Sequence, residues 1–271
     1  MSTPTVSFQG ERGAYSEEAA TMFFGSAVTK ACRTFKEVFQ SVEEKSAEYG
    51  IAPAENSLEG SINQTYDLLL ETPLKICGEV KVRVRHCLLT LPGTRLEDLR
   101  VVYSHPQALA QCAGFLEKLG LETIPTYDTA GSAKMLIEKQ LKAGAIASER
   151  AAEIYGLEVL RKGIEDFPEN FTRFFVLAKI DAPPTGKDRT SIVFATTHTP
   201  GSLHSALGEL ASRQINLTKI ESRPIRGTPW EYNFFVDFDG HQKDATVSQA
   251  INALRTSTAM LKILGSYPRA D

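Results

Sequence analysis

One polar stretch decides how the chain folds: Asp181-Ala182-Pro183-Pro184-Thr185-Gly186-Lys187-Asp188. Two prolines and a glycine interrupt regular structure here, and apolar runs lie on both sides, so the stretch is expected to be a linker. A chain of 271 residues is long enough for about two domains. We therefore predict one domain over residues 1–180 and a second over residues 188–271.

The second predicted domain has the simpler pattern. Its strands are expected at residues 191–196, 217–223, 232–238 and 262–266, and its helices at 202–213 and 245–256. Apolar side chains recur at helical spacing on the inner face of each helix: Leu203, Leu207, Leu210 and Ala211 in the first, and Val247, Ala250, Ile251 and Leu254 in the second. The resulting order, βαββαβ, is that of the ferredoxin-like split unit.

The first predicted domain alternates short apolar strands with helices, which indicates an α/β sheet with parallel pairing. Helices are expected at residues 16–24, 62–70 and 107–119, and from about residue 149. Residues 80–84 differ, because valines alternate there with Lys81 and Arg83 as in a half-buried strand. This segment fits two interpretations equally well: a crossing between two lobes that leaves a ligand-binding cleft, or the edge strand of one continuous sheet.

Composition and charge exclude several classes of function. The 30 basic and 33 acidic residues give a net charge of −3, which argues against nonspecific binding to nucleic acid. The four cysteines form no close pair, so we expect reduced thiols and no metal. Gly10 and Gly13 lack the spacing of a dinucleotide fingerprint, and no cofactor is expected. The sequence shows neither a leader pattern nor a membrane-spanning run, so a cytoplasmic location is expected.

Polar side chains follow predicted strands or open helices in the first domain, where open α/β sheets usually bind ligands. The four segments are residues 53–60, 104–109, 128–132 and 170–174. Each offers hydroxyls or amides together with backbone N–H groups at a helix start, which suits binding of carboxylate or phosphate. Taken singly, each is better explained by helix capping, because Ser, Thr, Asp and Asn favour those positions.

Taken in order, the segments are far more specific. The order comprises Glu55-Asn56-Ser57-x-Glu59-Gly60, Ser104-His105-Pro106-Gln107-Ala108-Leu109, Asp128-Thr129-Ala130 and Asn170-Phe171-Thr172-Arg173-Phe174. Together with residues 8–16 it resembles the prephenate dehydratase family across the first domain. The resemblance implies a bilobed domain built like the type II periplasmic binding proteins, with the substrate in the cleft. The second domain resembles an ACT domain, and Glu221-Ser222-Arg223-Pro224 matches the ESRP motif of its phenylalanine-sensitive members.

The resemblance implies a carbon–oxygen lyase that converts prephenate to phenylpyruvate, carbon dioxide and water in L-phenylalanine biosynthesis. It assigns the acid role to Thr172, which we expect to act mainly as a strong hydrogen-bond donor to the departing hydroxyl. Arg173 is expected to bind a substrate carboxylate with two hydrogen bonds. The remaining expected substrate-binding residues are Asn56, Ser57, Ser104, Gln107, Thr129 and Phe174, with Glu55, Glu59 and Asn170 in supporting roles. His105 is expected to be structural rather than catalytic.

The same resemblance implies a phenylalanine site in the second domain that a second copy of the chain shares. The expected effector-binding residues are Pro200, Gly201, Ser202, Leu203, Asn216, Leu217, Glu221, Ser222 and Arg223. The loop departs from the family pattern, because Gly201-Ser202-Leu203-His204 stands where Gly-Ala-Leu is usual. Charge pairing between Glu221 and Arg223 is the simpler explanation of those two side chains. A homodimer through this domain is expected, and from it a tetramer.

Two alternatives remain open at this point. An arogenate dehydratase would carry the same motifs and accept an amino acid side chain in place of the pyruvyl group. A non-catalytic small-molecule sensor would use the same cleft without turnover. The intact Thr172-Arg173-Phe174 argues against the second.

Overall fold

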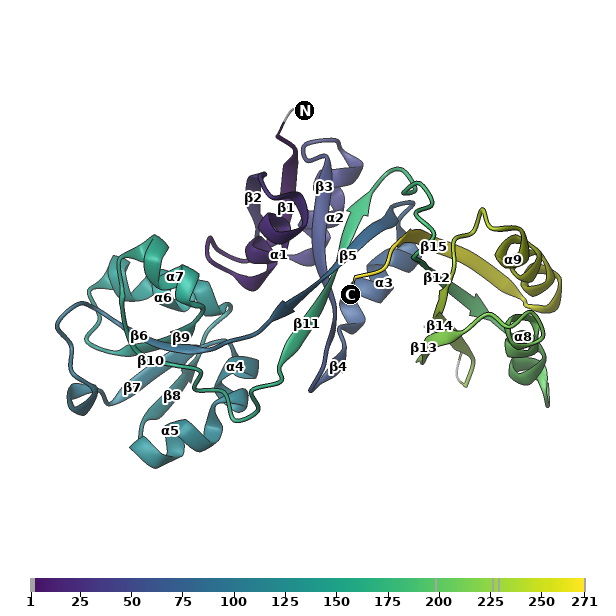
Figure 1. Ribbon diagram of the computed structural model, residues 1–271. Coiled ribbons are helices and arrows are strands. Elements are labelled where there is room, and N and C mark those ends of the chain that lie inside the picture. The colour runs from purple at the N-terminus through teal and green to yellow at the C-terminus, as the bar shows by residue number, and fades with distance from the viewer. Residues whose placement is uncertain (1–2, 198, 226, 229, 271) are drawn as a thin grey trace. The chain divides into compact units, whose positions relative to one another are not determined.

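The computed structural model describes residues 3–197, 199–225, 227–228 and 230–270 (Figure 1). Contacts divide the chain into two compact units, one of Met1–Ile62 with Val80–Phe174 and one of Asn63–Glu79 with Phe175–Asp271. This division is not a single cut at the 181–188 stretch, because a segment from the first half groups with the C-terminal part. The domain bounds of 1–180 and 188–271 therefore stay a prediction.

The first sheet has the strand order β2-β1-β3-β11-β5, with β4 paired to β3. The strands are β1 (Thr5–Gln9), β2 (Val28–Cys32), β3 (Tyr49–Asn56), β4 (Gly60–Ser61), β5 (Lys75–Arg83) and β11 (Phe171–Ala178), and the first two helices are α1 (Tyr15–Phe24) and α2 (Phe35–Glu43). Strand β1 pairs in parallel with both β2 and β3. Its centre is buried at Val6, Ser7 and Phe8, as expected for a strand covered on both faces.

The second sheet has the order β10-β6-β9-β7-β8. Its strands are β6 (Cys87–Thr90), β7 (Val101–Ser104), β8 (Glu122–Pro125), β9 (Gly144–Ala147) and β10 (Glu158–Lys162). Its helices are η1 (Leu96–Asp98), α4 (Pro106–Gln111), α5 (Ala113–Leu119), α6 (Thr129–Lys139) and α7 (Glu149–Tyr155). The chain enters this sheet after β5 and leaves it before β11 (Figure 1). Of the two interpretations of residues 80–84, the structure shows the crossing between two sheets, and β5 is at the same time the edge strand of the first sheet.

The single helix predicted over residues 107–119 is wrong. The structure divides it at Cys112, which has φ −115° and ψ 16°. The carbonyl of Gln111 accepts a hydrogen bond from the backbone N–H of Asp166 at 2.8 Å, and the N–H of Gly114 donates to the Asp166 carboxylate at 3.1 Å. Both backbone groups would be bonded within a continuous helix. A residue more than 50 positions away therefore takes over the hydrogen bonds that would have joined α4 to α5.

The C-terminal part of the chain has the predicted βαββαβ order. It comprises β12 (Asp188–Ala195), α8 (Ser202–Ala211), β13 (Leu217–Pro224), β14 (Tyr232–Asp239), α9 (Ala245–Ser257) and β15 (Met260–Pro268). The sheet order is β13-β14-β12-β15, with antiparallel pairing throughout. Together with the two sheets described above, it confirms the expected α/β class.

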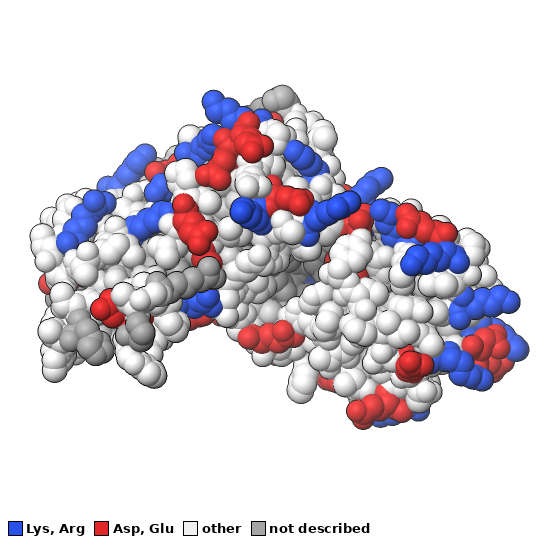
Figure 2. Space-filling model, turned by 180° about the vertical axis from the view of Figure 1, so that it is seen from behind, with Lys and Arg blue, Asp and Glu red and all other residues white. Residues whose placement is uncertain are grey.

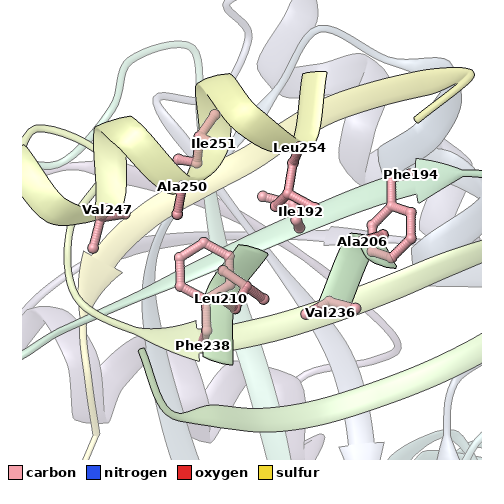
Figure 3. Close-up of a cluster of buried hydrophobic side chains, with 10 residues drawn as sticks. All are labelled: Ile192, Phe194, Ala206, Leu210, Val236, Phe238, Val247, Ala250, Ile251 and Leu254. Atoms are coloured by element: carbon pink, nitrogen blue, oxygen red, sulfur yellow. The ribbon is translucent and has the colours of Figure 1, made fainter. Parts of the chain in front are cut away.

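The core between this sheet and its helices holds the apolar residues that the periodicity indicated. Val247, Ala250, Ile251 and Leu254 of α9 face the strand residues Ile192 and Phe238 (Figure 3). Leu210 of α8 is buried, whereas Leu203 and Leu207 are partly buried. The expected inward position of Ala211 is wrong, because this last residue of α8 is exposed.

Helix α3 (Asn63–Glu71) belongs to the same unit as this sheet. Its Tyr66 ring lies 5.0 Å from the ring of Phe235 on β14. The ammonium of Lys262 donates to the carbonyl oxygens of Leu69, Leu70 and Thr72. A cation at this position satisfies the carbonyls that the helix end leaves without partners. Within the described ranges, no helix is both long enough and apolar enough to cross a bilayer.

Candidate active site

The site centres on the place where β3 ends and β11 begins. Asn56, the last residue of β3, directs its amide nitrogen to the hydroxyl oxygen of Thr172 at 3.0 Å and to the side-chain oxygen of Asn170 at 2.7 Å. All three side chains belong to residues that are at most 8% exposed. In such surroundings a hydrogen bond is electrostatically stronger than in water. The structure therefore brings together three of the residues that the sequence singled out.

The direction of these hydrogen bonds is fixed by the backbone. The side-chain oxygen of Asn56 accepts from the N–H groups of Leu58 at 3.0 Å and Glu59 at 3.2 Å, so the amide nitrogen must face Thr172. Thr172 Oγ1 accepts this hydrogen bond and keeps its own proton for donation. Thr172 is therefore a hydroxyl donor whose oxygen accepts a hydrogen bond from Asn56.

Two further residues continue the same network. Asn170 Nδ2 donates to Gln111 Oε1 at 2.9 Å, and Gln111 Nε2 donates to Glu59 Oε1 at 2.8 Å. His86 Nε2 lies 2.9 Å from the same Gln111 oxygen. Neither Gln111 nor His86 was among the predicted site residues. Gln111 lies four positions after Gln107 and hence on the same helical face, which was an available signal; His86 offered none.

Ser57 and Ser104 use their hydroxyls within the protein. Ser57 Oγ donates to the carbonyl of Glu169 at 3.1 Å and accepts from the N–H of Phe171 at 3.0 Å. Ser104 Oγ, fully buried, donates to the carbonyl of Ile146 at 2.6 Å. These contacts hold β3 against the start of β11, and β7 against β9. Direct contact of either serine with a substrate stays a prediction.

The other predicted substrate-binding side chains are more dispersed. Arg173 Nη1 lies 3.9 Å from Glu55 Oε2, and by strand alternation Arg173 projects to the face of β11 opposite to Thr172. Phe174 is 2% exposed. Gln107 and Thr129 are half-buried at the starts of α4 and α6. Their contacts with a substrate also stay predictions.

Two helix starts show the capping that their residue types favour. His105 Nδ1 accepts from the N–H of Gln107 at 3.3 Å, which is the structural role expected for His105. Asp128 Oδ2 accepts from the N–H groups of Gly131 at 2.9 Å and of Glu11 at 3.1 Å. Burial raises the pKa of the Asp128 carboxyl, against the opposing effect of these hydrogen bonds. Asp128 therefore connects the loop after β1 to the lobe that contains α6.

Glu11 forms a second connection between the lobes. Its carboxylate accepts from Lys134 Nζ at 3.0 Å and from the hydroxyl of Tyr127 at 2.9 Å. Burial alone would raise the pKa of Glu11, but the hydrogen bonds from Lys134 and Tyr127 outweigh it, and the pKa lies below its ordinary value. Burial raises the pKa of Tyr127. The lobes are thus held together by an ionised carboxylate.

A separate cavity of about 440 Å³ lies at the start of α8. Its lining residues are Thr196, Thr197, Thr199, Pro200, Ser202, Leu203, Glu231, Tyr232 and Phe234. Three of the predicted effector residues therefore line one cavity. Gly201 caps α8 with φ 82°, a conformation that glycine adopts without strain.

The predicted effector residues of β13 form other pairs. Glu221 lies 3.4 Å from Lys219, and Arg223 lies 2.9 Å from Asp67. Asn216 Nδ2 donates to Asp239 at 2.9 Å, and Leu217 packs on the core of this sheet. A pairing of Glu221 with Arg223, the simpler explanation given above, is not what these contacts show.

Surface charges, cysteines and possible metal ligands were compared with the candidate site among the described residues. Lys and Arg side chains alternate with Asp and Glu over the face seen in Figure 2. All four cysteines are free, and burial raises the pKa of Cys77 to about 12. Among the residues that the structure describes, no three His, Cys, Asp or Glu side chains are grouped closely enough to hold a metal ion.

Curated relatives match almost the whole chain. A bifunctional chorismate mutase/prephenate dehydratase of Aquifex aeolicus is 44% identical over 268 residues, which are 98% of this chain and 74% of that protein. An arogenate dehydratase/prephenate dehydratase 2 of Arabidopsis thaliana is 47% identical over 276 residues, which are 97% of this chain and 72% of that protein.

Two solved structures have the same fold over 98% of this chain. One, described as GqqA, a quorum quenching acylase, is 38% identical with a TM-score of 0.90 and 98% of its own chain covered. The other, a prephenate dehydratase from Arthrobacter aurescens in complex with L-Phe, is 32% identical, also with a TM-score of 0.90 and with 90% of its chain covered. The prephenate dehydratase family model matches residues 6–182, and the ACT domain model matches residues 190–256. The chain therefore belongs to the prephenate dehydratase family, with a C-terminal ACT domain.

Proposed function

We propose that the protein is a prephenate dehydratase that is inhibited by L-phenylalanine. The observation that carries the proposal is the hydrogen bond from Asn56 Nδ2 to Thr172 Oγ1, which leaves the Thr172 proton for donation within a buried site. The matching family model over residues 6–182 and the relatives described above support the same reaction. The cytoplasmic location stays a prediction from the sequence.

The reaction needs one proton and one bond alignment. The bond from the ring to the carboxylate carbon breaks and its electron pair forms the new ring double bond, which releases carbon dioxide. The ring hydroxyl on the opposite carbon leaves with its electron pair, takes a proton and becomes water. Aromatisation provides the driving force, so the enzyme has to position the substrate and to stabilise the departing oxygen.

Thr172 is proposed to donate to that oxygen. A threonine hydroxyl is too weak an acid to transfer its proton completely, so stabilisation by hydrogen bonding is the larger effect. The Asn56 N–H that points at Thr172 Oγ1 favours negative charge on that oxygen and therefore strengthens the donor. Gln107, Thr129 and Ser57 are proposed to contact the substrate carboxylates, and Arg173 with Glu55 to provide charge next to the site.

The test compares purified wild-type protein with Thr172→Val and Thr172→Ser on prephenate at neutral pH, following phenylpyruvate. Valine preserves the shape without the hydroxyl, and we expect kcat to fall by about 10²-fold or more, whereas serine keeps most of the activity. Thr123→Val, at an exposed position on β8, is the matched control. Normal turnover by folded Thr172→Val would refute the role of Thr172, and no turnover by the wild type would refute the reaction.

Arogenate is the second candidate substrate, because the Arabidopsis relative is named for both activities. The same assay with arogenate in place of prephenate, following phenylalanine, decides between them through the ratio of kcat/KM values. An acylase activity, as in the description of GqqA, has less support from this site. A hydroxyl nucleophile needs an adjacent base, whereas the partner of Thr172 is an amide N–H donor.

The cavity at the start of α8 is proposed as the phenylalanine site. Pro200, Leu203 and Phe234 offer an apolar wall, Glu231 offers an acceptor for the ammonium group, and the threonine hydroxyls offer donors for the carboxylate. A relative of 32% identity has been solved in complex with L-Phe, which supports this ligand. Isothermal titration with L-Phe and with D-Phe tests the site, and equal heats for both would contradict a specific pocket.

Homodimerisation through β13 is proposed to complete this site. Strand β13 is an edge of its sheet, and Ile220 is 43% exposed on it. An exposed edge strand presents backbone donors and acceptors that a second copy can pair. Glu221, Ser222 and Arg223 would then lie at the interface between copies, and a tetramer would form from two such dimers. Light scattering of the wild type and of Ile220→Lys tests the dimer, which we expect this substitution to weaken.

A further inference from the structure

We propose that His86 is a positioning residue for the Thr172 site, because its Nε2–H fixes the side-chain amide of Gln111. The proposal rests on the proposed function, since it concerns the same reaction. His86 precedes β6 and is 2% exposed. It does not contact Thr172, and its influence passes through Gln111, Asn170 and Asn56.

His86 is held in place through its backbone and through the packing of its ring. Its backbone N–H donates to Glu165 Oε2 at 2.9 Å, and its carbonyl accepts from the N–H groups of Gly163 at 2.9 Å and Ile164 at 3.1 Å. The ring packs edge-on against Tyr15, with ring centres 5.8 Å apart. A ring anchored this way has little freedom to follow a neighbour, so the neighbour must adapt to the ring.

The proton on the ring can be assigned from the contacts of Gln111. Gln111 Nε2 faces a carboxylate oxygen of Glu59, so the other end of the amide, Oε1, faces Asn170 Nδ2 and His86 Nε2. An amide oxygen carries no proton, and His86 Nε2 must therefore carry the proton of this hydrogen bond. In the neutral ring, Nδ1 is then unprotonated.

The buried position of the ring favours its neutral form. The Tyr15 hydroxyl lies 3.4 Å from Nδ1 and donates its own proton to the carbonyl of Arg85 at 2.7 Å. Burial lowers the pKa of His86, against the raising effects of the Gln111 hydrogen bond and the Glu165 carboxylate. A neutral ring with its proton on Nε2 is thus the form that supports Gln111.

Loss of the His86 Nε2–H donor would first loosen Gln111 and then affect Asn170 and Asn56 in turn. Among the described residues, the Gln111 amide then keeps its hydrogen bonds to Asn170 and to Glu59, which is exposed. If the amide turned over, its NH₂ group would face the NH₂ group of Asn170, and two donors cannot bond to each other. Asn170 would turn in response and present its donor end to the donor end of Asn56. Since Leu58 and Glu59 hold the orientation of the Asn56 amide, this repulsion would displace its N–H from Thr172 Oγ1.

The test replaces His86 by two amide side chains of different length. In His86→Gln the side-chain nitrogen reaches the position of Nε2, whereas in His86→Asn it reaches only the position of Nδ1. We expect His86→Gln to keep kcat within about fivefold, and His86→Asn and His86→Leu to lower kcat by about 10–100-fold with little change in KM, as for other residues that orient a direct ligand. Equal kcat values for all three variants, each with an unchanged melting temperature, would overturn the proposal.

A double-mutant cycle keeps the test decisive if the His86 variants lose stability. Because His86 acts through Gln111, His86→Leu should lower kcat much less in a Gln111→Ala background than in the wild type. Additive losses would show that His86 acts by another route. The tautomer is measured separately by long-range ¹H–¹⁵N NMR of the wild type, and a proton on Nδ1 would also overturn the proposal. This spectrum needs no turnover, so failure here is distinguishable from failure of the proposed reaction.

Discussion

Arg223 holds the carboxylate of Asp67, with its Nη2 2.9 and 3.1 Å from the two oxygens. Arg223 ends the Glu221-Ser222-Arg223 segment of β13, and Asp67 lies on α3. Helix α3 begins two residues after β4, and β4 closes the loop that contains Asn56 and Ser57. One helix thus links a strand that we propose for effector binding to the loop that we propose for catalysis.

Asp67→Asn removes the charge of this pair and keeps the shape. We expect the free energy of unfolding to fall by about 0.5–1 kcal/mol, since the pair is only partly buried. We also expect the phenylalanine concentration for half-maximal inhibition to rise at least about fivefold, which is the lower end of common allosteric couplings, with kcat unchanged. Activity assays over a phenylalanine series measure this, with Asp181→Asn at an exposed position as control. An unchanged inhibition midpoint would contradict the connection.

Asn56→Asp exchanges the donor that supports Thr172 for an acceptor. The backbone N–H groups of Leu58 and Glu59 still find an oxygen, so the loop should keep its shape. The carboxylate would repel negative charge on Thr172 Oγ1 and on Asn170 Oδ1, and we expect kcat to fall by about 10²–10³-fold. Steady-state kinetics measure the effect. Asn252→Asp, on the exposed face of α9, should be nearly neutral.

Leu203→Ala shortens the apolar wall of the cavity at the start of α8. We expect L-Phe to bind at least about tenfold more weakly, in line with 1.5–3 kcal/mol for a fully buried leucine side chain. Activity without phenylalanine should stay within about twofold, because Leu203 belongs to the C-terminal unit, whereas Asn56, Asn170 and Thr172 belong to the other. Titration calorimetry supplies the affinity, and Leu119→Ala on α5 is the matched control. Equal affinities for wild type and variant would place the ligand elsewhere.

Glu11 should make stability sensitive to acid. Its pKa in the folded state lies below the ordinary value of 4.5, so its contribution is fully present above that value and is lost as pH falls through the folded pKa. Glu11→Gln removes the contribution at neutral pH and flattens the stability curve below about pH 5. Urea unfolding at a series of pH values measures both curves. Parallel curves for wild type and variant would show that Glu11 does not contribute.

The spacing of apolar residues was sufficient to predict the C-terminal fold. It did not predict the break between α4 and α5 or the grouping of α3 with the C-terminal sheet. The βαββαβ order is local, since each strand and helix is specified by the spacing of its own apolar residues, such as Ala250 and Leu254 on α9. The break at Cys112 is not local, because Asp166, which is distant in sequence, takes the hydrogen bonds of Gln111 and Gly114. The grouping of α3 with the C-terminal sheet also depends on contacts of high sequence separation, such as those of Lys262.

The candidate site also combines residues that the sequence predicted with residues that it did not. Asn56, Asn170 and Thr172 were predicted from motifs, and the structure brings them together. Gln111 and His86 were not predicted: the spacing from Gln107 could have indicated Gln111, whereas the role of His86 comes from tertiary hydrogen bonds alone. Nor did the pattern show that Ser104 turns inward, since a serine before a helix looks the same whether its hydroxyl faces a ligand or a carbonyl.

The contacts of Asn56 also bear on how the enzyme ages. An asparagine followed by serine is prone to deamidation, which begins when the backbone nitrogen of the next residue attacks the side-chain carbonyl carbon. Here the nitrogen of Ser57 donates to the carbonyl of Phe171 at 2.8 Å, and the Asn56 oxygen is held by Leu58 and Glu59. The folded chain therefore protects an amide whose hydrolysis would reverse a donor at the proposed reaction centre, and that protection lasts as long as β3 and β11 stay paired.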